Sequence, residues 1–154
     1  MARKKKVVDE NKIILYDKVI RKEFILRNLE FFNKENTVMV NEFGITKKRV
    51  ADIFHFDFNT NISTIFEIKG ERDDICKRLE GQLNVYTSYA NIVYVVTSEN
   101  HLTKIEELLA RKIYGKNVGI IKVDITGEMF IPQMVYEGKE VQSRLQMLKE
   151  SFKK

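Results

Sequence analysis

Residues 91–97 read Asn-Ile-Val-Tyr-Val-Val-Thr, and this nearly unbroken run of apolar, β-branched side chains constrains the fold more than any other feature of the chain. A strand with one solvated face alternates apolar and polar residues, whereas a continuous apolar run is typical of a strand buried on both faces of a sheet. Residues 118–125 have the same character. Strands of this kind occur where helices cover both faces of a sheet, so we expect an α/β protein.

The periodicity of the other segments predicts the order of elements around these two strands. In chain order, the sequence predicts a helix over 10–33, strands over 37–42, 49–58 and 63–69, a helix ending near 89, the strand 91–97, a helix over 102–114, the strand 118–125, a short strand over 129–136 and a helix over 140–152. The helical crossover from 63–69 to 91–97 favours a parallel, right-handed connection. We therefore predict an α/β sandwich with a mixed central sheet flanked by helices.

A chain of 154 residues is long enough to bury a core, and we expect one domain over residues 10–154 after a basic flexible tail over residues 1–9. The single cysteine, Cys76, excludes an internal disulfide and suits a reducing compartment. There is no apolar run of membrane-spanning length and no apolar signal segment, so we expect a cytoplasmic protein with no membrane partner. The glycine-rich and Gly-x-Ser-x-Gly signatures of common NTPases, dehydrogenases and hydrolases are also absent.

Two carboxylates and a lysine interrupt neighbouring apolar strands and indicate a metal site. Asp52 stands within 49–56, and Glu67-Ile68-Lys69 closes the strand that follows. Because a strand alternates its side chains, Glu67 and Lys69 point to the same face. If the two strands pair, the carboxylates and the ammonium converge, which costs free energy unless a partner compensates. A divalent cation removes most of that cost, since hard cations such as Mg2+ favour oxygen ligands.

Gln82 and Tyr86 follow in the next predicted helix, where their spacing of four places them on one face, one turn apart. With these residues the chain resembles the PD-(D/E)XK nuclease superfamily, whose core carries an aspartate on one strand and Glu-x-Lys on the next. The added Gln-x-x-x-Tyr helix is similar to the branch that includes the RecB-type and lambda-type exonucleases. The chain departs from the pattern at Val50-Ala51, where no proline precedes the aspartate. The resemblance implies the restriction-endonuclease-like form of the α/β sandwich.

The stretch from residue 38 to about residue 109 also resembles a small, largely uncharacterised group of bacterial and phage proteins within that superfamily. The shared features are, in order, Glu42, Arg49 to Asp52, Glu67 to Lys69, Arg72-Asp73-Asp74 and Gln82 to Tyr86. This resemblance covers about half of the chain and implies a reaction class rather than a biological role.

The chemistry of the residues and the resemblance together suggest their roles. Asp52 and Glu67 are the predicted metal ligands, and the Ile68 carbonyl is a candidate for a further oxygen ligand. Lys69 is expected beside the attacking water, where it would orient or deprotonate that water or balance charge on the phosphate.

A further carboxylate often completes the site in this superfamily, and two residues compete for that place. Glu42 ends the first predicted strand near Arg49 and Asp52, and it is the preferred candidate. Glu23 is the alternative, because it shares a helical arc with apolar residues such as Ile20, an unusual place for a charge.

Four residues are candidate contacts to nucleic acid. By resemblance, Gln82 and Tyr86 steady the site or touch the DNA backbone. Arg78 lies one turn before Gln82 on the same helical face, and Arg49 lies just upstream of Asp52.

The sequence thus predicts a Mg2+-dependent nuclease, with Mn2+ as a substitute metal, that hydrolyses phosphodiester bonds of DNA, or alternatively of RNA. Endonuclease and exonuclease action are both left open. A net charge of +5 suits a nucleic-acid partner. The alternative is a non-catalytic nucleic-acid-binding module or a subunit of a larger DNA-processing or defence assembly. Since 154 residues barely exceed the core, a homodimer or a protein partner is one source of substrate choice.

Overall fold

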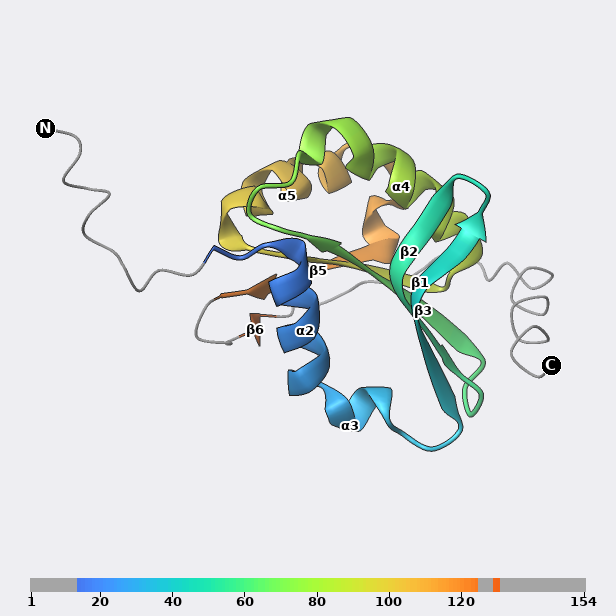
Figure 1. Ribbon diagram of the computed structural model, residues 1–154. Helices are drawn as coiled ribbons and strands as arrows, with labels where there is room; N and C mark the ends of the chain where they lie inside the picture. Colours follow the sequence, from blue (N-terminus) through green and yellow to red (C-terminus); the bar gives the residue numbers. More distant parts are fainter. Residues whose placement is uncertain (1–13, 125–128, 131–154) are drawn as a thin grey trace, which may run out of the picture.

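A computed structural model describes residues 14–124 and 129–130, and it places a sheet between two layers of helices (Figure 1). The described strands form one six-stranded sheet in the order β1-β2-β3-β4-β5-β6. Their bounds are β1 Thr37–Thr46, β2 Arg49–Asp57, β3 Ile62–Lys69, β4 Ile92–Thr97, β5 Val118–Val123 and β6 Met129–Phe130. Neighbours pair antiparallel from β1 to β3, parallel from β3 to β5, and antiparallel again at β6. The predicted α/β sandwich with a mixed sheet is confirmed.

The helices divide between the two faces of the sheet, as Figure 1 shows. One layer holds α2 (Asp17–Arg27) and α3 (Leu29–Phe32), and the other holds α4 (Ile75–Tyr89) and α5 (Leu102–Ala110). Two short 3-10 helices, η1 (Glu99–His101) and η2 (Ile113–Asn117), flank α5. None of the helices in the described ranges has the length and apolar character needed to cross a membrane.

Several predicted elements differ in extent from those observed. The helix predicted over 10–33 is two helices in its described part, because the chain turns at Asn28, whose side chain donates to the Phe24 carbonyl at 2.7 Å. The strand predicted over 37–42 continues to Thr46, and the helix predicted over 102–114 ends at Ala110. The tail over 1–9, the end of the strand predicted over 129–136 and the helix predicted over 140–152 lie outside the described residues.

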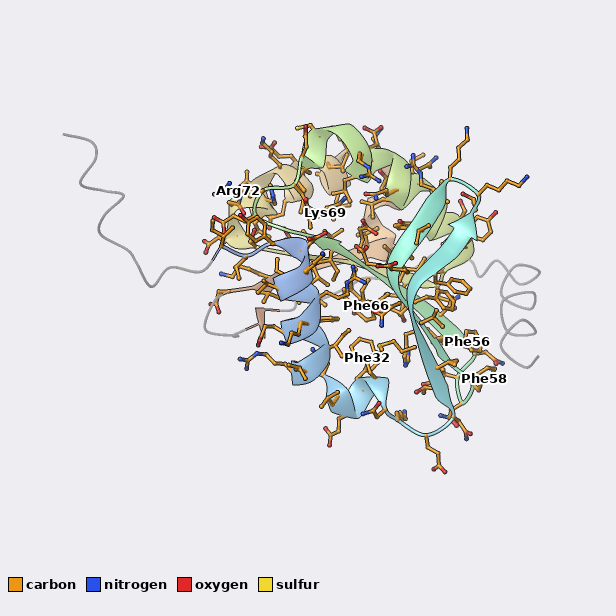
Figure 2. All side chains as sticks on the ribbon, in the orientation of Figure 1. Phe32, Phe56, Phe58, Phe66, Lys69 and Arg72 are labelled. Carbon is orange, nitrogen blue, oxygen red and sulfur yellow. The ribbon has the colours of Figure 1, made fainter. Side chains whose placement is uncertain are left out.

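Apolar side chains fill both spaces between the sheet and the helices. On the α4 side, helical spacing buries Ile75, Leu79, Leu83 and Tyr86 against the strands. On the other side, Ile20 and Phe24 of α2 pack with residues that include Phe32 and Phe66. Figure 2 shows Phe32 and Phe66 in the layer between α3 and the sheet. The sheet is therefore covered on both faces, as the apolar runs in β4 and β5 require.

The crossover through α4 is fixed at both ends. At its start, the Asp74 side chain caps α4 by accepting the Cys76 N–H at 3.0 Å. At its end, Asn91 and Ser63 bond reciprocally: the Ser63 N–H donates to the Asn91 side chain at 2.9 Å, and the Asn91 N–H donates to the Ser63 hydroxyl at 3.1 Å. Since α4 connects the end of β3 to the start of its parallel neighbour β4, the helix runs back across the sheet. Its first turns therefore lie near the Lys69 end of β3.

Candidate active site

The site begins where β2 and β3 stop pairing. Their antiparallel register ends at Ile53 opposite Phe66. One residue further back in β2, the Asp52 carboxylate accepts the Ile68 N–H at 2.7 Å and so takes the place of a strand partner. Because the N–H and C=O of a strand residue point to the same side, the Ile68 carbonyl also faces β2. The structure thus brings the Asp52 carboxylate and the Ile68 backbone together, and the role of the Ile68 carbonyl as a metal ligand stays a prediction.

Glu67 and Lys69 lie side by side at the end of β3, and both are buried. The Lys69 Nζ is 3.4 Å from Glu67 Oε2, and the two residues are 5% and 3% exposed. The other carboxylate oxygen, Glu67 Oε1, is buried and has no hydrogen-bond partner. Figure 2 shows Lys69 on the side of the sheet where the chain leaves β3 for α4. The ammonium therefore satisfies half of the carboxylate and leaves one acceptor for another group.

Burial raises the pKa of both carboxyl groups. Burial is the main reason that the pKa of Glu67 rises to about 7, and the negative charge of Asp52 adds to the rise. The Lys69 ammonium and the Tyr86 hydroxyl oppose it. Burial also raises the pKa of Asp52, against the Ile68 hydrogen bond and the positive charge of Arg21. The charge of Asp52 thus reaches the Glu67 carboxyl, so the two acids belong to one electrostatic neighbourhood.

Helix α4 covers this pair with Tyr86 and Gln82. The Tyr86 hydroxyl donates to the Val50 carbonyl at 3.0 Å, and it also lies close enough to Glu67 to lower the pKa of that carboxyl. A hydroxyl carries one proton, so the bond to Val50 leaves Glu67 Oε1 without a donor. Gln82 is 5% exposed, and its Oε1 has no partner either. Because α4 runs back across the sheet, Gln82 lies one turn from Tyr86 towards the Lys69 end.

Of the two arginines predicted to contact nucleic acid, Arg49 lies beside the acid pair and Arg78 is on the exposed face of α4. The Arg49 guanidinium lies over Gly81 of α4, 2.7 Å from where a Cβ would stand, and its charge lowers the pKa of Tyr86 against the larger effect of burial. Arg49 is thus next to the site. Arg78 is exposed on α4 and is not part of this cluster.

Sequence reasoning missed a contribution from α2. Arg21 and Asp17 both act on the Asp52 carboxyl, Arg21 lowering its pKa and Asp17 raising it. They lie one helical turn apart, so the i,i+4 spacing of two polar residues beside buried Ile20 and Phe24 was the signal that could have found them. Their side chains bring α2 to the edge of the acid pair.

The two candidates for a further carboxylate are both solvent-accessible and form different ion pairs. Glu42 pairs with Arg21 at 3.5 Å, and Glu23 pairs with Arg27 at 3.3 Å. Arg21 therefore links Glu42 to the neighbourhood of Asp52, whereas Glu23 faces Arg27. Across the described ranges, no three His, Cys, Asp or Glu side chains gather closely enough to hold a metal. The participation of either glutamate in a metal site stays a prediction.

The chemistry of the donors fits Mg2+. Of the three buried side-chain atoms without a partner in the described residues, Glu67 Oε1 and Gln82 Oε1 belong to this site. Both are oxygen acceptors, which a cation or its bound water satisfies. Mg2+ is commonly held by one or two carboxylates and completes its shell with water and substrate phosphate, so two carboxylates such as Asp52 and Glu67 would be enough to hold it.

Comparisons with known proteins give one family and one fold neighbour. The family model described as bacteriophage P4 protein cII matches residues 8–152 of the chain. A solved protein of unknown function from Silicibacter pomeroyi is 15% identical with a TM-score of 0.58, over 84% of this chain and 81% of that one. This likeness supports the fold alone. No curated protein matches the chain significantly.

Proposed function

The chain belongs to the bacteriophage P4 protein cII family, and we propose that it is a metal-dependent nuclease that hydrolyses phosphodiester bonds, with DNA as the substrate. The observation that carries this proposal is the buried Glu67 carboxylate. It shares the end of β3 with Lys69 and keeps one oxygen without a donor, next to the Asp52 carboxylate of β2. If the Glu67–Lys69 ion pair were purely structural, the nearby Asp52 carboxylate would add repulsion and no stability. A cation site, in contrast, uses both carboxylates as ligands.

Asp52 and Glu67 would hold Mg2+, with Mn2+ as a substitute, and the metal would lower the pKa of a water molecule and neutralise charge on the phosphate. The reaction adds water across a P–O bond: the water oxygen joins phosphorus, and a proton reaches the leaving oxygen. Lys69 is fixed beside Glu67 at 3.4 Å, so its ammonium is held where it can orient the attacking water or balance the phosphate charge. Tyr86 and Gln82 close the site from α4.

The Asp52 side chain has a second task within the site. By accepting the Ile68 N–H it holds the Ile68 backbone against β2, so that the Ile68 carbonyl is available as a further oxygen. Arg21, whose positive charge reaches Asp52, stands at the α2 edge of the pair, where a substrate phosphate would arrive. The single cysteine is consistent with action in the cytoplasm, where thiols stay reduced.

The test is cleavage of labelled plasmid, linear duplex and single-stranded DNA with Mg2+, with Mn2+ and with EDTA. The wild type is compared with Glu67→Gln, which keeps size and shape but removes the charge. Glu106→Gln is the matched control, because Glu106 is an exposed residue of α5 away from the site.

We expect metal-dependent cleavage by the wild type and the control, and a loss of about 100- to 1000-fold in Glu67→Gln, the range seen when a principal charge-stabilising group is removed. The substrate pattern then separates endonuclease from exonuclease action. Equal cleavage by Glu67→Gln would refute the assignment. Binding without cleavage by the wild type would favour the alternative, a non-catalytic binding module or subunit.

A further inference from the structure

The hairpin between β1 and β2 ends in a cluster of positive charge, made of Lys47, Lys48 and Arg49. Lys47 and Lys48 are exposed, and within the described part of the chain neither forms an ion pair. No acidic residue lies in the turn, where the Thr46 hydroxyl instead accepts the Lys48 and Arg49 N–H groups at 3.2 and 3.1 Å. The turn therefore holds its lysines on a fixed backbone and leaves their ammonium groups to solvent.

The topology places this tip beside the acid pair. Because β2 and β3 are antiparallel, the start of β2 and the end of β3 lie at the same end of the sheet. Arg49 precedes Asp52 by three residues, which is about 10 Å along a strand. A nucleic-acid strand advances about 3.4 Å per nucleotide along its axis, so the tip would meet phosphates about three nucleotides from one bound at Asp52.

Helix α4 supports the hairpin from the side, and Figure 1 shows the hairpin rising next to that helix. The Arg49 guanidinium lies over Gly81, where the missing side chain makes room for it. A hollow of about 500 Å³ opens between the tip and Val85, lined by Thr46, Lys47, Lys48 and Arg49. Three positively charged side chains line this hollow, and no acidic residue is among its lining residues. Such a surface is complementary to a chain of phosphates and has no matching charge for a neutral or basic partner.

We propose that the tip of the β1–β2 hairpin, Lys47 to Arg49, is a nucleic-acid backbone clamp that holds the strand on one side of the acid pair. This extends the proposed function by adding a substrate contact outside the reacting site. The contact is made through phosphates, so it carries affinity without base specificity. Positive charge of this kind makes binding depend on salt, because each neutralised phosphate releases counterions.

The test measures binding to a labelled 20-mer duplex and a 20-mer single strand by fluorescence anisotropy, in EDTA, at several salt concentrations. Lys47→Ala/Lys48→Ala is compared with Lys34→Ala/Arg27→Ala, which removes the same charge. Lys34 forms an ion pair with Asp57, and Arg27 is the last residue of α2. Both lie away from the end of β3 that carries Lys69, so they serve as the control. Thermal unfolding checks that both variants keep their fold.

We expect the hairpin variant to bind about 10-fold more weakly at about 0.1 M salt. The slope of the logarithm of its binding constant against the logarithm of salt concentration should be smaller in magnitude by about one to two, and the control variant should match the wild type. An unchanged affinity and slope would overturn the clamp, as would equal losses in both variants. Binding of anionic lipid vesicles in place of DNA by the wild type would also overturn it. The binding assay is run in EDTA, so its result does not depend on cleavage. If the protein binds DNA through the hairpin but does not cleave it when Mg2+ is added, the clamp is supported and only the proposed nuclease activity is contradicted.

Discussion

The Asp52 carboxylate accepts the Ile68 N–H at 2.7 Å, at the point where the ladder between β2 and β3 has ended. The Asp52 side chain thus has two roles. It accepts the hydrogen bond that a backbone carbonyl of β2 would otherwise accept, and it places a negative charge beside Glu67. The two roles can be separated by substitution, because an amide oxygen accepts a hydrogen bond as a carboxylate does but brings no negative charge to a divalent cation.

For Asp52 we therefore expect Asn and Ala substitutions to differ in stability but not in activity. Both variants should lose metal-dependent cleavage. Asp52→Ala also leaves the Ile68 N–H without its acceptor, so its free energy of unfolding should be lower than that of Asp52→Asn by about 1–2 kcal/mol. Urea unfolding in EDTA measures the difference. Equal stability of the two variants would show that the hydrogen bond contributes nothing.

Glu67 predicts a dependence of stability on pH. Its pKa is about 7 in the folded protein and 4.5 as an ordinary glutamate, so the folded state binds the proton more tightly. Tighter proton binding by Glu67 in the folded state adds to the free energy of unfolding. This contribution has its full value below the ordinary pKa of 4.5 and is lost as the pH rises to about 7. The full difference corresponds to about 3 kcal/mol.

Between pH 4 and pH 8, in EDTA, the free energy of unfolding of the wild type should therefore fall by up to about 3 kcal/mol relative to Glu67→Gln, which has no carboxyl to titrate. Chemical unfolding across this pH range measures it, with Glu106→Gln as the control. Mg2+ added at pH 8 should recover much of the loss in the wild type alone, because ligand binding to the folded state stabilises it. A parallel pH profile for Glu67→Gln would contradict the raised pKa.

Tyr86→Phe should separate the hydroxyl from the buried ring. Removing the bond to the Val50 carbonyl should lower the free energy of unfolding by about 1 kcal/mol. It also removes a group that lowers the pKa of Glu67, so the pH profile of cleavage should move to higher pH. Tyr114→Phe is the matched control, since its hydroxyl bonds the exposed Glu80 carbonyl at 3.3 Å and faces away from the site. A profile that does not move would place the hydroxyl outside the chemistry.

The two candidates for a further carboxylate predict different results. Glu42 is joined through Arg21 to the neighbourhood of Asp52, whereas Glu23 pairs with Arg27 on α2 itself. We expect Glu42→Gln to reduce Mg2+-dependent cleavage by about 10-fold, a loss of about 1.4 kcal/mol in the activation free energy, and Glu23→Gln to leave it unchanged. Steady-state cleavage at limiting Mg2+ measures both. The reverse order would make Glu23 the residue that completes the site.

The sequence was informative where a pattern repeats along one element. The alternation of β3 predicts that Glu67 and Lys69 share a face, and the helical crossover from β3 to β4 predicts that the two strands are parallel neighbours. It was less informative where two distant elements meet. The spacing of Asp17 and Arg21 marks them as two polar residues on one side of α2, but which strand residue they approach depends on how α2 docks. The extent of β1 to Thr46 was also missed, because Gly44 reads as a turn residue although the strand passes through it.

The contact between the segment that leads into α2 and the turn that follows β3 bears on how the protein folds. The Leu15 N–H bonds the Glu71 side chain across 56 positions of the chain, whereas Asp52 and Ile68 are 16 apart. Closing the longer loop costs more entropy, so we expect the β2–β3 hairpin to form first and α2 to dock later. The two acids would then meet while they are still hydrated, and α4, which follows the hairpin in the chain, would cover and desolvate them after the folding transition state. The pH dependence caused by Glu67 should accordingly appear in the unfolding rate and leave the refolding rate nearly constant.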